Sequence, residues 1–150
     1  LPLLQKQRPL LPIPSLRTRE IPPMTKTQAL DPIVLTVAAD PRLARLVRMT
    51  AANVAALSSM SVDRVEDLRM AAEEAFIFAC SVDAGECVSL TFTVDDEHVA
   101  LDVDLGEGAI ADPEPDSPAA YAGLILTAVC DAYEKTDAPA RLHLELKADV

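Results

Sequence analysis

Two short runs of alternating hydrophobic residues constrain the fold of this chain most. Residues 88–94 and 99–103 each carry a hydrophobic side chain at every second position, and the acidic tripeptide 95–97 separates them. Because successive side chains of a strand point to opposite faces, the two runs predict a β-hairpin with one buried face. Residues 33–37 and 142–146 show the same alternation and predict two further strands. One-sided alternation in every strand indicates that helices cover one sheet face, while the other faces solvent or a partner.

The segments between these strands predict three helices. Asp40-Pro41 is typical of a helix start, an N-cap followed by proline in the first turn, and the helix should run to about Leu57. A second helix is expected at about 63–81, capped by Ser61 or Asp63, and a third at about 118–133. The expected buried residues are Leu43, Leu46, Val47, Val54 and Leu57 in the first helix and Val65, Leu68, Ala72, Ala75, Phe76 and Ala79 in the second.

The resulting order, β-α-α-β-β-α-β, predicts an α/β two-layer sandwich over residues 32–150. It would have a mixed, mostly antiparallel sheet with three helices on one face. Residues 1–31 contain six of the twelve prolines and no periodic pattern. We expect them to form a disordered or extended tail. Met24 is an alternative translation start, which would make 1–23 an upstream segment.

The charge of the chain changes sign between the proline-rich residues 1–31 and the predicted domain 32–150. Residues 1–31 have a net charge of +3 and residues 32–150 a net charge of −14. A domain with this much negative charge repels the phosphate backbone of a nucleic acid. We therefore expect no direct nucleic-acid binding. A basic protein partner would suit it, and an acidic surface that serves only solubility is the alternative.

Compartment and metal content follow from other features of the sequence. No apolar run reaches the roughly 18 residues that span a bilayer, and the first residues are broken by prolines and charges. We therefore expect a cytoplasmic protein with no membrane contact. Cys80, Cys87 and Cys130 have no metal-ligand spacing, and we expect no metal site built from them.

Residues 41–80 carry a set of motifs in order and without a gap: Arg48-Met49-Thr50, Ser61-Val62-Asp63, Val65-Glu66-Asp67-Leu68-Arg69 and Glu74. This stretch resembles the first two helices of the bacterial anti-sigma factors that double as serine-protein kinases. The resemblance extends more weakly over about 33–147. It implies the histidine-kinase-like (GHKL) ATPase fold, which has this order of elements.

The resemblance also implies roles for individual residues. Glu74 matches the general base of the family, and Phe78 stands where an asparagine would hold magnesium. A phenyl ring offers no oxygen ligand to that ion. Asp104, Gly106 and Gly108 match the adenine-recognition motif, but strand parity turns Asp104 outward together with Asp102.

A third family motif is a glycine-rich turn before the last helix. Its place is taken here by 119–122, where alanines would hinder a close approach of backbone to phosphate. These departures indicate that binding of ATP and magnesium is lost or weak.

These observations favour an anti-sigma-like regulator of transcription, with a sigma factor or an anti-anti-sigma protein as partner and Arg45 and Arg48 in the partner-binding surface. A homodimer is compatible with this function. Two alternatives remain open: an active serine-protein kinase of the same family with Glu74 as base, and an unrelated α/β ligand-binding domain.

Overall fold

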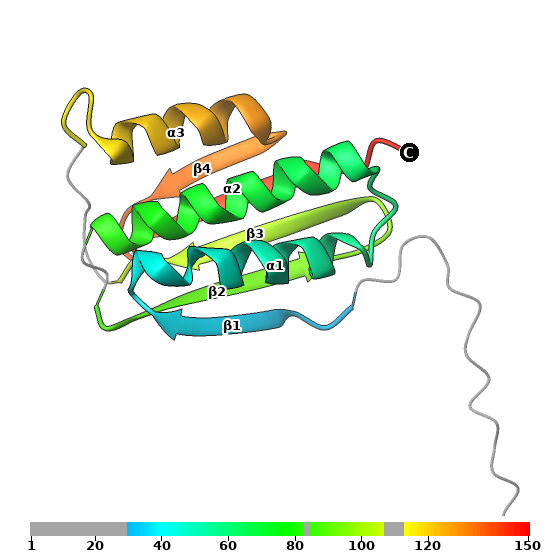
Figure 1. The fold of residues 1–150 in the computed structure, drawn as a ribbon, viewed down its shortest axis with the longest axis horizontal. Coiled ribbons are helices and arrows are strands. Elements are labelled where there is room, and N and C mark those ends of the chain that lie inside the picture. Colours follow the sequence, from blue (N-terminus) through cyan, green and yellow to red (C-terminus); the bar gives the residue numbers. More distant parts are fainter. Residues whose placement is uncertain (1–29, 83–84, 107–112) are drawn as a thin grey trace, which may run out of the picture.

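The computed structural model describes residues 30–82, 85–106 and 113–150. Within these ranges the chain forms one five-stranded antiparallel sheet and three α-helices (Figure 1). The expected tail 1–31 lies, except for residues 30 and 31, outside the described residues. The elements are β1 (Ile33–Ala38), the 3-10 segment η1 (Pro41–Leu43), α1 (Ala44–Ala55), α2 (Val62–Ser81), β2 (Cys87–Val94), β3 (His98–Asp104), α3 (Pro118–Val129), β4 (Ala132–Thr136) and β5 (Arg141–Lys147).

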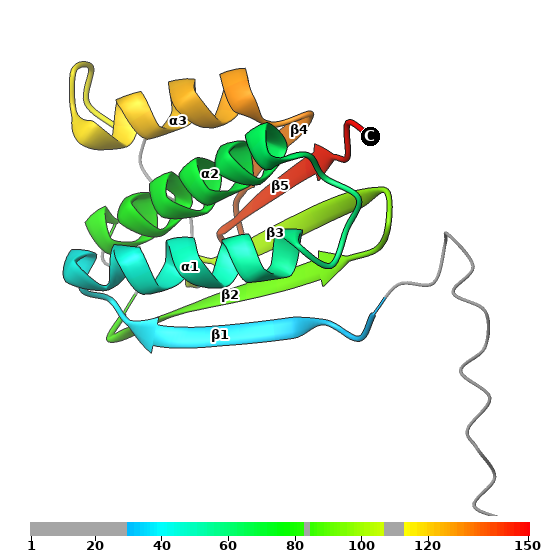
Figure 2. The same ribbon diagram turned by 45° about the vertical axis from the view of Figure 1, so that its right-hand side comes forward.

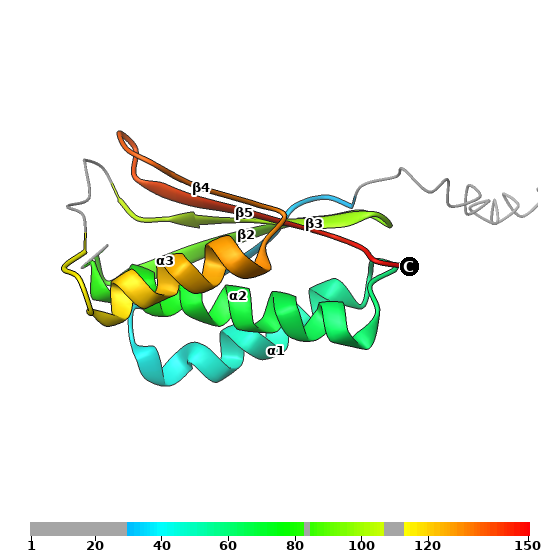
Figure 3. The same cartoon turned by 90° about the horizontal axis from the view of Figure 1, so that it is seen from above.

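The strands lie in the order β1-β2-β3-β5-β4, and every neighbouring pair is antiparallel. The sheet of the described residues is therefore wholly antiparallel rather than mixed. All three helices cover one face of it, which confirms the predicted two layers (Figure 3). The central helix α2 packs between α1 and α3 (Figure 2). The opposite face of the sheet, here called the open face, carries no helix (Figure 3).

Capping residues begin the helices where the sequence predicts. The Asp40 carboxylate accepts a hydrogen bond from the Arg42 amide at 2.9 Å, although the first turn is η1 rather than α-helix. Ser61, not Asp63, caps α2 by accepting from the Arg64 amide at 3.2 Å. Ser117 caps α3 in the same way.

The apolar face of α1 differs from the prediction. Leu46 is 47% exposed, and Leu57, which lies beyond the end of α1 at Ala55, is 49% exposed, so neither belongs to the core. The buried residues of the helix are Ala44, Val47, Ala51, Val54 and Ala55. Small alanines let the α1 backbone approach its neighbours closely, and this turns the larger leucines toward solvent. In α2 the predicted core is confirmed except that Val65 is only partly buried, and Ala71 and Phe78 join it.

The C-terminal third contains a strand that the sequence analysis missed. The last helix ends at Val129 rather than 133, because Cys130 has extended backbone (φ −82°, ψ 146°). β4 follows and pairs with β5 at the edge of the sheet. The observed order is thus β-α-α-β-β-α-β-β, one strand more than expected.

Candidate functional site

Glu74 lies on α2 in the helical layer. It is half-buried, and burial, followed by the charge of Glu73, raises the pKa of its carboxyl group. Glu73 forms an ion pair with Arg48, whose Nε lies 3.2 Å from its carboxylate. Glu74 makes no hydrogen bond or ion pair within the described part of the chain. A raised pKa and a free carboxylate are compatible with a general base, provided that a substrate can reach it.

Phe78 follows Glu74 by one helical turn and is only 3% exposed. Its ring lines a shallow pocket of about 290 Å³ between the end of α2 and the start of α3, together with Ser81, Val82, Pro113, Glu114, Ser117, Pro118 and Ala119. The Lys135 ammonium lies 5.9 Å from the ring centroid on the β4 side. The structure thus places a packed phenyl ring at the position that the resemblance assigns to a magnesium ligand.

The pocket beside Phe78 is poorly suited to a nucleotide. Its volume lies just below the roughly 300–1,000 Å³ typical of small-molecule sites. Glu114 is its charged lining residue, and no lysine or arginine lines it among the described residues. The stretch 119–122 belongs to α3 and is helical, and Ser117 already bonds the Ala120 amide. A triphosphate would find neither a cation nor a glycine turn here.

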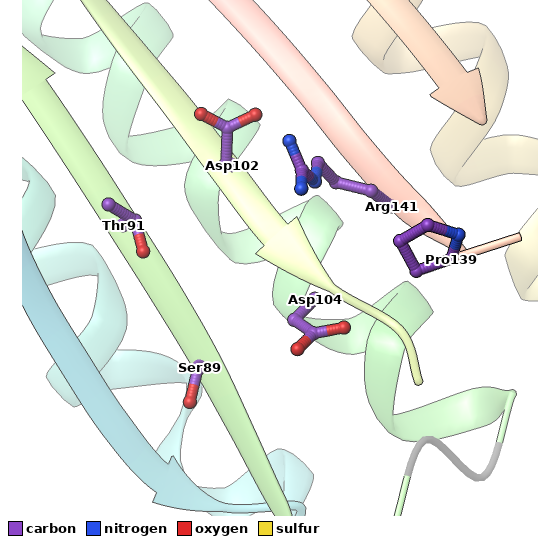
Figure 4. Close-up of a pocket in the computed structure, with 6 residues that line it drawn as sticks. All are labelled: Ser89, Thr91, Asp102, Asp104, Pro139 and Arg141. Atoms are coloured by element: carbon purple, nitrogen blue, oxygen red, sulfur yellow. The ribbon is translucent and has the colours of Figure 1, made fainter. Parts of the chain in front are cut away.

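Asp104 lies at the end of β3 and faces the open side of the sheet, as strand parity predicts (Figure 4). Its Oδ1 accepts a hydrogen bond from the Gly106 amide at 3.0 Å, and Gly106 has a positive φ of 94°. Gly108 lies outside the described residues. The sheet therefore stands between Asp104 and Glu74, and the structure does not bring together the two side chains that the resemblance assigns to one nucleotide site.

Arg45 and Arg48 lie on α1 but differ in their surroundings. Arg45 is exposed and forms no ion pair among the described residues, whereas Arg48 is held by Glu73 of α2. Next to Arg45, Leu46 and Met49 are 47% and 53% exposed. Arg45, Leu46 and Met49 form one exposed stripe, which we call the α1 stripe.

Arg64 was not singled out by the sequence analysis, yet it joins three elements. Its Nε donates to the Lys147 carbonyl at 2.9 Å and its Nη1 to the Val129 carbonyl at 3.2 Å. The guanidinium also pairs with Asp67 and with Asp131, which in turn accepts from the Lys147 amide. The side chain is only 15% exposed. This network fixes α2 against the end of α3 and against β5.

The open face carries a second pocket, of about 350 Å³, that the sequence analysis did not predict. Its lining residues are Ser89 and Thr91 of β2, Asp102 and Asp104 of β3, Pro139, and Arg141 of β5 (Figure 4). The sequence does indicate that polar residues of the alternating strands point to the open face. Combining them into one pocket also requires the pairing of β3 with β5, which are distant in sequence.

His143 lies beside this pocket, between two carboxylates. Its Nδ1 is 2.7 Å from Asp102 Oδ1 and its Nε2 is 3.1 Å from Glu145 Oε1. Burial alone would lower the pKa of His143, but the hydrogen bonds to Asp102 and Glu145 and their charges outweigh burial and raise it. Asp102 is thereby held in place by its register partner on β5.

The cysteines and the acidic side chains of the described residues offer no further catalytic or metal site. The three cysteines are free, and burial raises the pKa of Cys130 to about 11, which makes it a poor nucleophile. Across the described ranges, no group of three or more His, Cys, Asp or Glu side chains is arranged to hold a metal ion. Each helix there is too short or too polar to cross a bilayer.

Comparison with known proteins adds no assignment. No protein-family model and no curated protein sequence matches the chain.

Proposed function

We propose that this chain is an anti-sigma-like regulator of the histidine-kinase-like fold that acts by binding proteins and has lost its nucleotide site. The resemblance of residues 41–80 is the basis for the family, and a two-layer sandwich with three helices on one face is compatible with that fold. Such a regulator would sequester a sigma factor and release it to a competing anti-anti-sigma protein. Release by competition requires only mutually exclusive interfaces, without phosphorylation.

The observation that carries the loss of nucleotide binding is the placement of Asp104. An adenine-recognising carboxylate and a catalytic base must face the same ligand, but Asp104 faces the open side of the sheet and Glu74 the helical layer. The buried Phe78 ring supports the same conclusion, because it occupies the position of a magnesium ligand.

The α1 stripe is the surface that best fits a protein partner. Leu46 and Met49 leave apolar surface exposed, and Arg45, which has no ion-pair partner in the described part of the chain, supplies a positive charge beside them. Apolar and arginine side chains of this kind are enriched in protein interfaces. The expected partner therefore presents apolar residues and a carboxylate to α1. The net charge of −14 over residues 32–150 suits the basic DNA-binding surfaces of a sigma factor.

Binding experiments with the full chain test this proposal. Sigma factors and anti-anti-sigma proteins from the same genome are titrated against the chain by calorimetry, and Mg-ATP is titrated separately. We expect at least one of these proteins to bind, and Mg-ATP at millimolar concentration not to bind. Arg45→Glu should weaken the protein complex, whereas the matched charge reversal Lys147→Glu, at the far end of β5, should leave it unchanged. Tight Mg-ATP binding, or no binding by any of these proteins, would contradict the proposal.

One observation favours the second candidate, an active serine-protein kinase. The raised pKa of Glu74 would make its carboxylate a stronger base than an ordinary glutamate. Radiolabelled phosphate transfer from ATP to an anti-anti-sigma protein, abolished in Glu74→Gln, would establish this activity. We expect no transfer, because the pocket beside Phe78, one helical turn from Glu74, offers neither the asparagine nor the glycine turn that the resemblance requires.

A further inference from the structure

We propose that the open-face pocket binds a small zwitterion of the α-amino-acid class, with Arg141 holding the carboxylate and Asp104 the ammonium group. This inference is independent of the proposed regulatory function, because the pocket lies on the side of the sheet opposite the helices. It concerns a site made by β2, β3 and β5 alone, apart from Pro139 at its rim.

The two charges of the pocket face each other without neutralising each other. Asp104 and Arg141 are direct partners in the β3–β5 register. Opposite charges in such positions are close enough to pair. Yet the Arg141 side chain forms no ion pair or hydrogen bond among the described residues, and the Asp104 carboxylate accepts only from the Gly106 amide. In Figure 4 the Arg141 side chain extends along the sheet toward Asp102, away from Asp104. An unpaired cation and an unpaired carboxylate therefore line one cavity.

Local hydrogen bonds hold both carboxylates in place. The Gly106 amide fixes one oxygen of Asp104 and leaves its other oxygen available. Asp102 is fixed by His143 at 2.7 Å. On the β2 side, Ser89 bonds the Thr36 hydroxyl at 3.0 Å, so the hydroxyl rim of the pocket is also anchored. Fixed polar groups lose little freedom when a ligand binds, which favours binding.

The lining narrows the chemical class of the ligand. Two carboxylates disfavour a phosphate or another anion, and the Arg141 guanidinium disfavours a simple cation such as a polyamine. Among the described residues no aromatic side chain lines the pocket, so it offers no stacking platform for a sugar or a nucleobase. A ligand with both charges satisfies both sides, because guanidinium groups bind carboxylates in a forked geometry and Asp104 accepts from an ammonium group.

The test is a titration of the full chain with each standard α-amino acid, followed by NMR and calorimetry. We expect at least one to bind with a dissociation constant of roughly 1 mM or lower, as suits an open site with two charged contacts. Acetate and methylamine, which each carry half of the charge pattern, should bind at least about ten-fold more weakly. Equal binding of acetate or methylamine, or no response to any amino acid at these concentrations, would overturn the assignment.

Four variants locate the site. Arg141→Gln and Asp104→Asn should each weaken amino-acid binding by about ten-fold or more, since each removes one charged contact. The matched controls are Lys147→Gln, on the same face of β5 but six residues away, and Asp63→Asn, on α2. Both should bind like the unmodified chain. Circular dichroism verifies that all four variants are folded. Unchanged affinity in folded Arg141→Gln and Asp104→Asn would refute the proposed site.

Discussion

Replacing Phe78 tests whether its ring is a packed part of the core at the expected magnesium position. Phe→Ala substitutions in cores cost about 3–5 kcal/mol through lost transfer energy and the cavity left behind. Phe78 is 3% exposed, but one side of its ring lines a pocket and lacks contacts there. Loss of the Lys135 contact at 5.9 Å adds roughly 0.5–1 kcal/mol. We therefore expect Phe78→Ala to lower the free energy of unfolding by about 3 kcal/mol.

Phe78→Asn introduces the amide that the resemblance would require at this position, and it should destabilise the fold more than Phe78→Ala does. Burying an amide without partners costs roughly 1–3 kcal/mol, and the pocket gives it access to water on one side only. The expected loss is about 4 kcal/mol, a large part of the 5–15 kcal/mol typical of a domain. Urea unfolding followed by circular dichroism measures these losses, with Phe78→Leu as the control at about 1 kcal/mol. A loss below about 1 kcal/mol for Phe78→Ala would show that the ring is not packed.

The same variants separate packing from nucleotide binding. A ligand at 100 times its dissociation constant stabilises a protein by about 2.7 kcal/mol, which raises the melting temperature by several degrees. We expect no such rise with Mg-ATP in the unmodified chain or in Phe78→Asn, because Asp104 remains on the open face in both. A rise in the unmodified chain would refute the loss of the nucleotide site. A rise confined to Phe78→Asn would show that the ring alone blocks it.

Three further predictions concern other parts of the molecule. Arg64→Leu should lower the free energy of unfolding by about 2–3 kcal/mol in urea denaturation, since it removes the donor to the Lys147 and Val129 carbonyls and the ion-pair partner of Asp131. Arg45→Glu should change stability by no more than about 0.5 kcal/mol while weakening partner binding, whereas Arg48→Glu should cost about 1 kcal/mol because it breaks the half-exposed ion pair with Glu73. The raised pKa of His143 in the folded state stabilises the fold while the ring is protonated. This contribution is complete below the unfolded pKa of about 6.5 and is lost as pH rises through the higher folded pKa. Melting temperatures should therefore show a larger deficit of His143→Gln at about pH 6 than at about pH 8, and an equal deficit at both would contradict the role of His143.

Local sequence patterns predicted most of the fold. Period-two alternation located β1, β2, β3 and β5, and the caps at Asp40 and Ser61 located the helix starts. The sequence did not predict β4, because one of its two inward positions is Lys135, whose ammonium lies near the Phe78 ring. A lysine on the inner face of an edge strand breaks the apolar alternation that identifies strands, although its stem packs like an apolar chain.

The exposed leucines of α1 show a second limit. Leu46 and Leu57 rank above alanine in hydrophobicity, so a pattern read from one helix places them inside. The face that packs is instead lined by Ala44, Ala51 and Ala55 together with the predicted Val47 and Val54, and the alanines let α1 approach its neighbours closely. Which stripe is buried depends on the neighbouring elements and not on the helix alone.

The candidate sites depend on long-range pairing to different extents. The alternation of side chains along β3 alone predicts that the Asp104 side chain points to the open face. The resemblance places Glu74 and Phe78 within one helix. The open-face pocket needs Asp104 and Arg141 to be register partners, although 36 residues separate β3 and β5. Such a pairing is not encoded in a local pattern: the hairpin assigns one edge of β3 to β2, but no short-range signal says which distant strand pairs with the other edge.

The sheet makes the two faces of this domain separable in experiment. Its helical side carries Phe78, Glu74 and the α1 stripe, on which the regulatory proposal depends, while the open side carries the pocket of Asp104 and Arg141. Side chains on opposite faces of a strand share no direct contact, so substitutions on the two faces should act nearly additively. Loss of amino-acid binding in Arg141→Gln with an intact protein complex, and the reverse result in Arg45→Glu, would assign each activity to its own face. A protein complex weakened equally by both variants would instead mean that the partner reaches the open face, and the pocket would then belong to that interface.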